Sequence, residues 1–593
     1  MAKAQDPERD GRSALMAARV RIGLVVVLVA LVVLGGRLFQ LQGLDTAGMA
    51  QAAVEKRLRT SEIPALRGEI LDANNNVLAR SVQRFDIVVD QRLIKDYTWF
   101  NPKTKQSEDV KITDAIADLA KALGQKTTTV SKAVLGDRPF NYVAKAVTPE
   151  VKNRVEELAF PGLQAQETTI RNYPDGEVAG SIVGFMGSEG KPLAGIEATQ
   201  DKILSGTPGE RTYEIGADGI RIPVATNQEV PAKDGRSVKL TLNSDVQWFA
   251  QETIAAQVKD YGAEYGNIVV VNAKTGDIIA MAESTTPDPN DPGATPVEQR
   301  EPFSVTKAFE PGSTTKMITM SAAIEEGLTT PTTRYTIPPT YTVDGQKFTD
   351  AVSHGTVERT TAGIFAKSMN TGTVMIGQHL TRQQRYDYLR KFGIGEQYDI
   401  GLAGMTPGLL AKPEDWDGRQ QYTVLFGQGL AQTSLHTAMA YAAIANNGVR
   451  MQPRLIDSYI DPDGTEHQQP RQKGIKVVSK KTAGLVQDML ETVSTQGGGL
   501  PGKVEDYRIG VKTGTAEVLD PDGSLGGYTI SMAGIAPMED PEYVVVATIQ
   551  KPKGGVFSLT AGPPFKKVMA QVLSTYNVPP STTKPVKLPL GDE

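Results

Sequence analysis

The longest apolar run of the chain lies close to its N-terminus. Residues 22–36 read IGLVVVLVALVVLGG, and the run continues to about residue 42 with one charge, Arg37. A stretch of about 20 such residues is long enough to cross the hydrocarbon core of a membrane. Three arginines lie just before it and Asp45 follows, so the positive-inside rule places residues 1–21 in the cytoplasm and everything after the 22–42 helix outside. The sequence therefore predicts a single-pass membrane protein.

Two other interpretations of this run are a cleaved signal peptide and a buried core helix. No small-x-small cleavage site follows the run, and this favours an uncleaved anchor. No second run of this length occurs in the sequence. We therefore expect the protein to be held in the cell membrane by this helix alone.

Residues 43–235 mix short strand-like and helix-like patterns. The alternation in residues 85–90 predicts a strand, and residues 114–124 have the spacing of an amphipathic helix that ends at a glycine. No candidate for site chemistry is found in this region. We therefore expect a mixed α/β pedestal with a scaffolding role.

A second domain is expected over residues 236–577. Strands are predicted at its two ends, with a turn at residues 273–276 joining the first pair of neighbouring strands. The sheet of this domain is therefore expected to be built from both termini of the region. The patterns are strands at 237–243, within 267–283 and at 542–551, and helices at 244–258 with Ser244 as cap and at 563–576 with proline at the start. Residues 578–593 are rich in proline and charge and are expected to form a flexible tail.

The amino-acid composition argues against several classes of function. The 593 residues carry a formal net charge of -5 and no long basic run, which gives no support for nucleic-acid binding. Cysteine is absent, and this excludes disulfides, thiol catalysis and cysteine-ligated metals. The four histidines are scattered, so no metal site is expected, and no cofactor is implied.

The first candidate for chemistry is the stretch FEPGSTTKMITM, in which Ser313 follows Pro-Gly and precedes Lys316 by three residues. Residues i and i+3 share a face of a helix, so both side chains would point the same way. A serine needs a neighbouring base to act as a nucleophile, and a lysine serves only when its surroundings keep it neutral. The alternative is a capping serine beside a surface lysine. Ser304 and Lys307 match the same pattern but run straight into Pro311-Gly312, which argues against that pair.

Two further stretches change the balance. AKSMNTGTV contains Ser368 and Asn370, the only Ser-x-Asn of the chain, and IGVKTGTAEV contains residues 512–515, Lys-Thr-Gly-Thr. Ser-x-x-Lys, Ser-Asp-Asn and Lys-Thr-Gly in this order form the signature of serine β-lactamases and penicillin-binding proteins. The middle motif of this chain has Met369 in place of the Asp and keeps both polar ends. A second Lys-Thr-Gly at 274–276 lies in a predicted turn before the nucleophile and is set aside. Gly514 is expected to let substrate lie close against its strand.

With these motifs the chain resembles class B penicillin-binding proteins, the peptidoglycan D,D-transpeptidases. The resemblance includes FGQGLAQTSLHTAMAYAAIANNGV and, in the pedestal, RGEILD (67–72), RNYP (171–174) and AGIEATQDKILSG (194–206). The family often has Asp-Arg-Asn-Gly after the first pedestal motif, whereas this chain has Asp-Ala-Asn-Asn-Asn. The layout is most similar to the division-specific (FtsI-type) enzymes, with the elongation type as a close relative.

The resemblance implies an α+β protein: a transmembrane helix, a dimerisation-type pedestal, and a β-lactamase-like domain with an antiparallel sheet between helical layers. The implied substrate is a peptidoglycan stem peptide ending in D-Ala-D-Ala. By the resemblance, Ser313 attacks the penultimate D-Ala carbonyl, Lys316 takes its proton, and Ser368 passes a proton to the departing D-Ala. An amine of a neighbouring stem peptide then takes the acyl group.

The resemblance also assigns the substrate contacts. Asn370 holds the stem-peptide amide, and Lys512 with the hydroxyls of Thr513 and Thr515 binds the terminal carboxylate. The backbone N–H groups of Ser313 and Thr515 form the oxyanion hole. β-Lactams acylate the same serine, and a membrane glycosyltransferase polymerase and other divisome proteins are the implied partners.

Other functions share these motifs. A β-lactamase would hydrolyse the acyl-enzyme, and a D,D-carboxypeptidase would use water on the same substrate. A β-lactam sensor or a catalytically idle scaffold would bind without turnover. A sensor is disfavoured because about 21 cytoplasmic residues are too few for an effector domain.

Overall fold

The computed structural model describes residues 7–40, 55, 57–101, 105–216, 222, 227–519, 524–554 and 557–592. Its first element is the helix α1 (Pro7–Phe39). The segment Leu15–Phe39 has a mean hydropathy of 2.6 and is not buried inside the described chain, and it is long and apolar enough to cross a membrane. It is the one helix of that kind among the described residues. The predicted span 22–42 falls on it, except that residues 41 and 42 lie outside the described part.

The chain forms two compact units that each combine separate segments. The first unit contains residues 1–64, 83–169 and 208–233, and the second contains residues 65–82, 170–207 and 234–593. The polypeptide therefore passes between the units several times before the second unit is completed.

In the first unit, helices pack on a short antiparallel sheet. The predicted strand 85–90 is part of β3 (Val77–Val89), which pairs with β6 (Asn141–Val147). The predicted helix 114–124 is α3 (Ile112–Leu123), and Gly124 ends it with φ 67°, a conformation that favours glycine. Both predictions are confirmed. The other elements are β1 (Leu58–Ile63), β4 (Tyr97–Asn101), β5 (Gln106–Val110), α4 (Thr127–Val134), α5 (Pro149–Glu156), β7 (Leu163–Asn172), β8 (Gly209–Glu214) and β9 (Asn227–Val230).

The second unit is built around a five-stranded antiparallel sheet with the order β12-β11-β23-β22-β21. Two strands come from the start of the region and three from its end, so the prediction that both termini build the sheet is confirmed. The strands are β11 (Tyr265–Asn272), β12 (Ile278–Glu283), β21 (Gly510–Leu519), β22 (Leu525–Ala536) and β23 (Tyr543–Gln550). β21 is the edge strand of this sheet and pairs with β22 on one side only.

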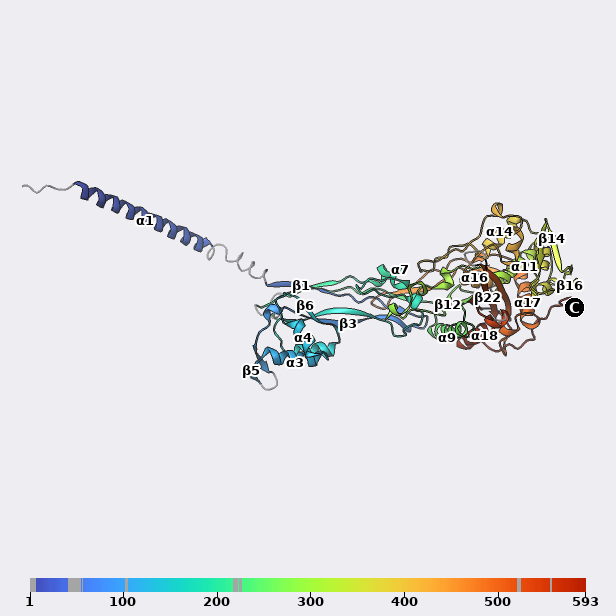
Figure 1. The fold of residues 1–593 in the computed structure, drawn as a ribbon, viewed down its shortest axis with the longest axis horizontal. Helices are drawn as coiled ribbons and strands as arrows, with labels where there is room; N and C mark the ends of the chain where they lie inside the picture. The colour runs from blue at the N-terminus through green and yellow to red at the C-terminus, as the bar shows by residue number, and fades with distance from the viewer. Residues whose placement is uncertain are drawn as a thin grey trace, which may run out of the picture. The chain divides into compact units, whose positions relative to one another are not determined.

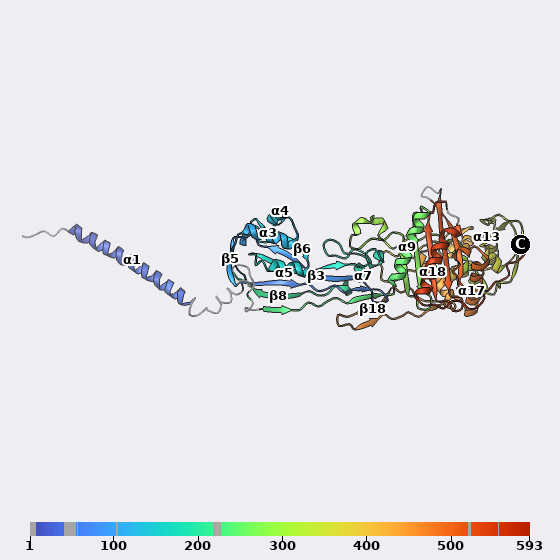
Figure 2. The same cartoon turned by 90° about the horizontal axis from the view of Figure 1, so that it is seen from below.

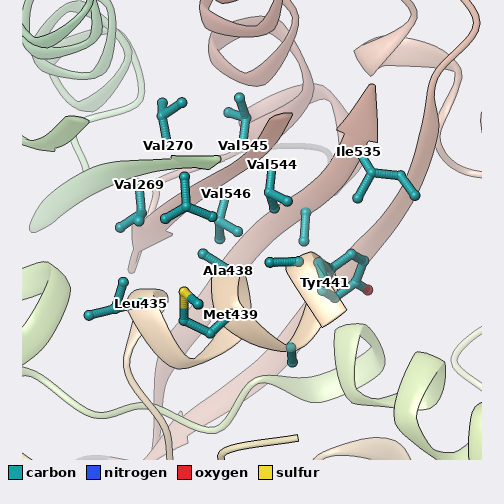
Figure 3. Packing of buried hydrophobic residues seen from close by; sticks show 14 of the residues in the cluster. Val269, Val270, Leu435, Ala438, Met439, Tyr441, Ile535, Val544, Val545 and Val546 are labelled. Carbon is teal, nitrogen blue, oxygen red and sulfur yellow. The ribbon is translucent and has the colours of Figure 1, made fainter. Parts of the chain in front are cut away.

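Helices cover both faces of this sheet. α9 (Ser244–Asp260) and α18 (Phe557–Thr575) lie side by side on one face (Figures 1 and 2), and α16 (Ser434–Ala445) packs on the other. Figure 3 shows Leu435 and Met439 of α16 facing the strand valines, and every residue of α16 is buried. Burial on all sides explains why apolar residues lie around the whole circumference of α16, beside the buried polar residues Ser434, His436 and Thr437. α17 (Lys480–Gln496) packs beside β21.

Two details of the sequence analysis are corrected. The cap of α9 is Asn243, whose side chain accepts the N–H of Val246 at 3.0 Å, and Ser244 instead donates its hydroxyl to Asp72 at 2.7 Å. α18 begins at Phe557, so its prolines lie inside the helix rather than at its start. The pattern located both helices but not their first turns.

The three pedestal motifs meet in the second unit through a buried ion network. Glu197 is fully buried, and its carboxylate lies 2.6 Å from Nε of Arg67 and 2.7 Å from Nε of Arg171. Arg67 also pairs with Asp201 at 2.5 Å, and the Tyr173 hydroxyl donates to Glu197 at 3.3 Å. The burial of an unpaired charge is costly, so these residues stabilise one another only as a set.

The C-terminal residues contradict the expected flexible tail 578–593. The stretch from 581 to 592 lies along the second unit as an extended strap: the N–H of Val586 donates to Glu491 at 3.0 Å, and that of Leu588 donates to Thr492 at 3.2 Å. Thr360 donates its hydroxyl to the Pro589 carbonyl at 2.5 Å. Proline and charge predict the absence of regular secondary structure, but they do not exclude backbone hydrogen bonds to side chains of another element.

Candidate active site

Ser313 lies on a tight turn in the second unit. The 3₁₀ turn η5 (Gly312–Thr315) runs directly into α11 (Lys316–Glu325), so Ser313 stands one turn before Lys316. Gly312 has φ 56°, and a Cβ at this position would lie 2.3 Å from the Thr515 carbonyl oxygen. Only glycine allows this approach, which places the Ser313 turn against β21.

The turn is supported from the core as well. The N–H of Gly312 donates to the Gly427 carbonyl at 3.0 Å, and the Tyr441 hydroxyl of α16 donates to the Thr314 carbonyl at 2.9 Å. Tyr441 is completely buried, and burial raises its pKa well above the ordinary value, so it stays a neutral donor. Thr314 and Thr315 are buried whereas Ser313 is only half-buried, so the turn presents the serine outward.

Lys316 is fully buried and surrounded by acceptors. Its Nζ donates to the Ser368 carbonyl at 2.5 Å and to Asn370 Oδ1 at 2.6 Å, and it lies 3.4 Å from Ser368 Oγ. Loss of solvation lowers the pKa of Lys316 to about 7, against the opposing charge of Asp350. A neutral amine that uses both hydrogens on these two acceptors keeps its lone pair free to accept a proton.

Ser368 accepts hydrogen bonds from both Lys316 and Lys512. Its φ of 56° is a left-handed conformation that is uncommon for serine, and it directs the carbonyl to Lys316. The Lys512 Nζ donates to Ser368 Oγ at 2.8 Å and to the Thr513 carbonyl at 3.0 Å. Burial and the neighbouring Lys316 lower the pKa of Lys512 well below its ordinary value. Two buried amines at this proximity favour one shared positive charge over two.

The structure gives Gly514 a different role from the one predicted. A Cβ on Gly514 would lie 2.8 Å from the Pro311 carbonyl oxygen and 2.4 Å from Ser531 Oγ, so its bare face meets the Ser313 turn rather than a substrate. Alternate residues of a strand share a face, and Thr513 and Thr515 are half-buried while Lys512 and Gly514 are buried. The two threonines therefore lie on the more accessible face of β21.

The structure also adds two residues that the sequence analysis missed. Asp350 accepts the backbone N–H groups of Asn370 and Thr371, the first residues of α13 (Asn370–Gly377). His354 lies with Nε2 2.8 Å from the Asp350 carboxylate. Asp350 precedes Asn370 by 20 residues and belongs to no short motif, so only the tertiary structure reveals it.

The second copies of two motifs, Ser304-x-x-Lys307 and the Lys-Thr-Gly at 274–276, are called decoys here because they lie away from the Ser313 turn. Ser304 is buried on the short helix α10 (Phe303–Thr306), while Lys307 is exposed and pairs with Glu301 at 2.9 Å. Lys274 lies in the turn between β11 and β12 and pairs with Asp540. The choice of residues 313–316 and 512–515 over these copies agrees with the geometry.

Comparison with known proteins connects this geometry to a family. The penicillin binding protein transpeptidase domain matches residues 266–570, and the penicillin-binding protein dimerisation domain matches residues 62–240. The chain therefore belongs to the penicillin-binding proteins with a transpeptidase domain.

Individual relatives show which kinds of penicillin-binding protein this chain is similar to. Penicillin-binding protein PbpB of Mycolicibacterium smegmatis is 35% identical over 97% of this chain and 93% of its own. Peptidoglycan D,D-transpeptidase FtsI of Escherichia coli is 29% identical over 98% of this chain and 95% of its own. The structure of penicillin-binding protein 3 of Mycobacterium tuberculosis complexed with aztreonam is 29% identical and covers 89% of this chain and 100% of that one, with a TM-score of 0.68.

Proposed function

We propose that this protein is a peptidoglycan D,D-transpeptidase that cross-links stem peptides during septal wall synthesis in cell division. The observation that carries the proposal is a connected set of hydrogen bonds one turn from Ser313, in which Lys316 donates to Ser368 and Asn370, and Lys512 donates to Ser368. The similarity to PbpB and FtsI over nearly the whole chain supports the same activity.

In the first step Ser313 Oγ attacks the carbonyl carbon of the penultimate D-Ala. Lys316 accepts the serine proton, because its lowered pKa leaves a large neutral fraction near pH 7. The backbone N–H groups of Ser313 and Thr515 bind the oxyanion; the close approach of Gly312 to Thr515 supports this placement. The tetrahedral intermediate then collapses to an acyl-serine.

Ser368 acts as the proton relay in the collapse. Its hydroxyl oxygen accepts from Lys512 at 2.8 Å, so its own proton is free to move to the departing D-Ala nitrogen and is replaced from Lys316. The C–N bond breaks and D-Ala leaves as an amine. The amino group of a second stem peptide then attacks the ester and returns the proton by the same route, which forms the cross-link.

Lys512 recognises the terminal carboxylate together with Thr513 and Thr515. A bound carboxylate raises the pKa of a buried amine, so substrate binding restores the charge that burial and Lys316 disfavour. This coupling keeps Lys316 neutral and Lys512 charged in the complex. Asn370 holds the stem-peptide amide with the Nδ2 group that Lys316 does not use.

The apolar helix supports anchorage in the cell membrane, and we place residues 1–21 in the cytoplasm and everything after the 22–42 helix outside. This topology brings the site to the extracytoplasmic wall. The proposed partners are a membrane glycosyltransferase polymerase, which supplies the glycan strands, and other divisome proteins.

The test is acylation by a fluorescent penicillin. We expect a stable label on the wild type that Ser313→Ala abolishes, while the matched decoy variant Ser304→Ala keeps it. Rapid turnover of the label would indicate a β-lactamase, and absence of label would indicate a scaffold. Release of D-Ala from stem peptides without cross-linking would indicate a carboxypeptidase, and a tagged protein outside mid-cell would indicate the elongation type.

A further inference from the structure

A buried carboxylate holds the start of the helix that carries Asn370. Asp350 follows β15 (Gln346–Thr349), and its side chain is 6% exposed. It accepts the N–H of Thr371 at 3.0 Å and the Thr371 hydroxyl at 2.5 Å, besides the N–H of Asn370. These donors are otherwise unpaired at the first turn of a helix, so Asp350 fixes the position of α13.

His354 completes a charge pair with this carboxylate. Its Nε2 lies 2.8 Å from Asp350 Oδ2 and its Nδ1 lies 2.5 Å from the Gly355 carbonyl. Both partners are acceptors, so both ring nitrogens donate in the doubly protonated ring. The Gly355 carbonyl and then Asp350 raise the pKa of His354, against partial burial and the charge of Arg359.

The Asp350–His354 pair is connected to Lys316, the proposed general base, through Asn370. The N–H of Asn370 is held by Asp350, while its Oδ1 accepts from Lys316 at 2.6 Å. Asp350 is also the charge that favours protonated Lys316. The other charged groups that face this set are Arg359 of β16 (Val357–Thr360), next to His354, and Lys512 of β21, next to Lys316.

We propose that Asp350 and His354 are positioning residues for acylation: the carboxylate orients Asn370 and adjusts how readily Lys316 takes up a proton, and the protonated histidine offsets the carboxylate charge. This inference rests on the proposed role of Lys316 as the base. Loss of His354 leaves the negative charge of Asp350 uncompensated and stabilises the Lys316 ammonium. Loss of the Asp350 charge has the opposite effect.

The experiment measures the second-order rate constant of acylation by a fluorescent penicillin between pH 5.5 and 9, with the full-length protein. For the wild type the rate rises with its midpoint near 7, because the neutral amine exists above the pKa of Lys316. His354→Gln moves this midpoint up by about half a pH unit, a roughly twofold lower rate at the wild-type midpoint. Asp350→Asn moves it down and lowers the plateau, because the amide still accepts but holds Asn370 more weakly.

The chain offers matched controls. His467 lies 2.7 Å from Asp461, and Asp417 accepts the N–H groups of Arg419 and Gln420 at 2.7 and 2.6 Å. His467→Gln and Asp417→Asn therefore remove the same kinds of interaction outside the site and leave the pH profile unchanged.

Three results would overturn the inference: midpoints that stay in place, midpoints that move in the same direction, or equal shifts in the controls. A purely structural role lowers the rate at every pH without a shift. If Asp350→Asn does not fold, His354→Gln decides alone, since its side chain is partly exposed on a loop. Normal acylation by Lys316→Arg would refute the base itself, whereas an inactive Lys316→Arg with unmoved midpoints would refute only this inference.

Discussion

A lysine removed from water either finds a counter-charge or loses its proton, and Lys316 is built for the second outcome. Its two short hydrogen bonds are to a carbonyl and an amide oxygen, which are neutral. Asp350 acts on it only through space. Its environment therefore holds an amine in place without requiring it to be charged.

The neutral hydrogen-bond partners of Lys316 predict the effect of replacing this residue with arginine. Lys316→Arg keeps a positive charge but cannot become neutral at working pH, so it supplies no base. We expect acylation by a fluorescent penicillin to fall at least ~100-fold, the usual contribution of general base catalysis. Lys307→Arg, at the exposed decoy, should acylate at the wild-type rate. Near-normal acylation by Lys316→Arg would remove Lys316 from its role.

At the residue scale, the ordered motifs were sufficient to find the residues that form the cluster. Ser368, Asn370 and Lys512 were recognised because their spacing and order repeat a known signature, although chemistry requires only that they meet in space. Asp350 and His354 were not predicted from the sequence. A capping carboxylate that lies 20 residues before its helix produces no periodic pattern and no short motif. The expected reason for Gly514, room for substrate, differs from its contact with the Ser313 turn, because a sequence cannot tell which neighbour a missing Cβ would meet.

At the scale of elements, the site depends on the close approach of β21 and η5. Two glycines, one on each element, let the backbones meet: Gly312 faces Thr515 and Gly514 faces Pro311. The Ser313 turn and the strand that carries Lys512 are therefore held in register by close backbone contact.

A methyl group added at Gly514, where β21 meets the η5 turn, should displace Ser313. In Gly514→Ala the new Cβ meets the Pro311 carbonyl oxygen at 2.8 Å, so the turn must shift. We expect acylation to fall between ~10- and ~100-fold, since small displacements of reacting groups are costly. The control is Gly484→Ala on α17, where a Cβ meets nothing within 4 Å and acylation should be unchanged. Equal rates in both variants would contradict the proposed contact.

At the scale of the whole molecule, each compact unit is assembled from segments far apart in the chain. Strands and helices were predictable because their apolar periodicity is local. The division into two interleaved units was not, because residues 65–82 and 170–207 carry no local sign that they pack with residues 234–593. The C-terminal strap was missed for the same reason: its partners lie on other elements.

The Glu197 network shows how such distant segments are joined, and it predicts a loss of stability. Glu197→Gln leaves Arg67 and Arg171 buried without their shared carboxylate, which should cost about 3–5 kcal/mol and lower the melting temperature. Glu189→Gln removes an exposed pair with Lys191 and should leave the melting temperature unchanged. A melting temperature of Glu197→Gln equal to that of the wild type would show that the network contributes nothing to folding.

The strap also sets an order of events during synthesis. The backbone around Thr360 and Gly363, just before Ser368, lies against residues 589–592, which are translated more than 200 residues later. On a ribosome that adds ~5–20 residues per second, this segment waits at least ten seconds for its partners. The serine and lysine of the first motif can thus be synthesised and folded while the segment before the second motif still lacks these partners.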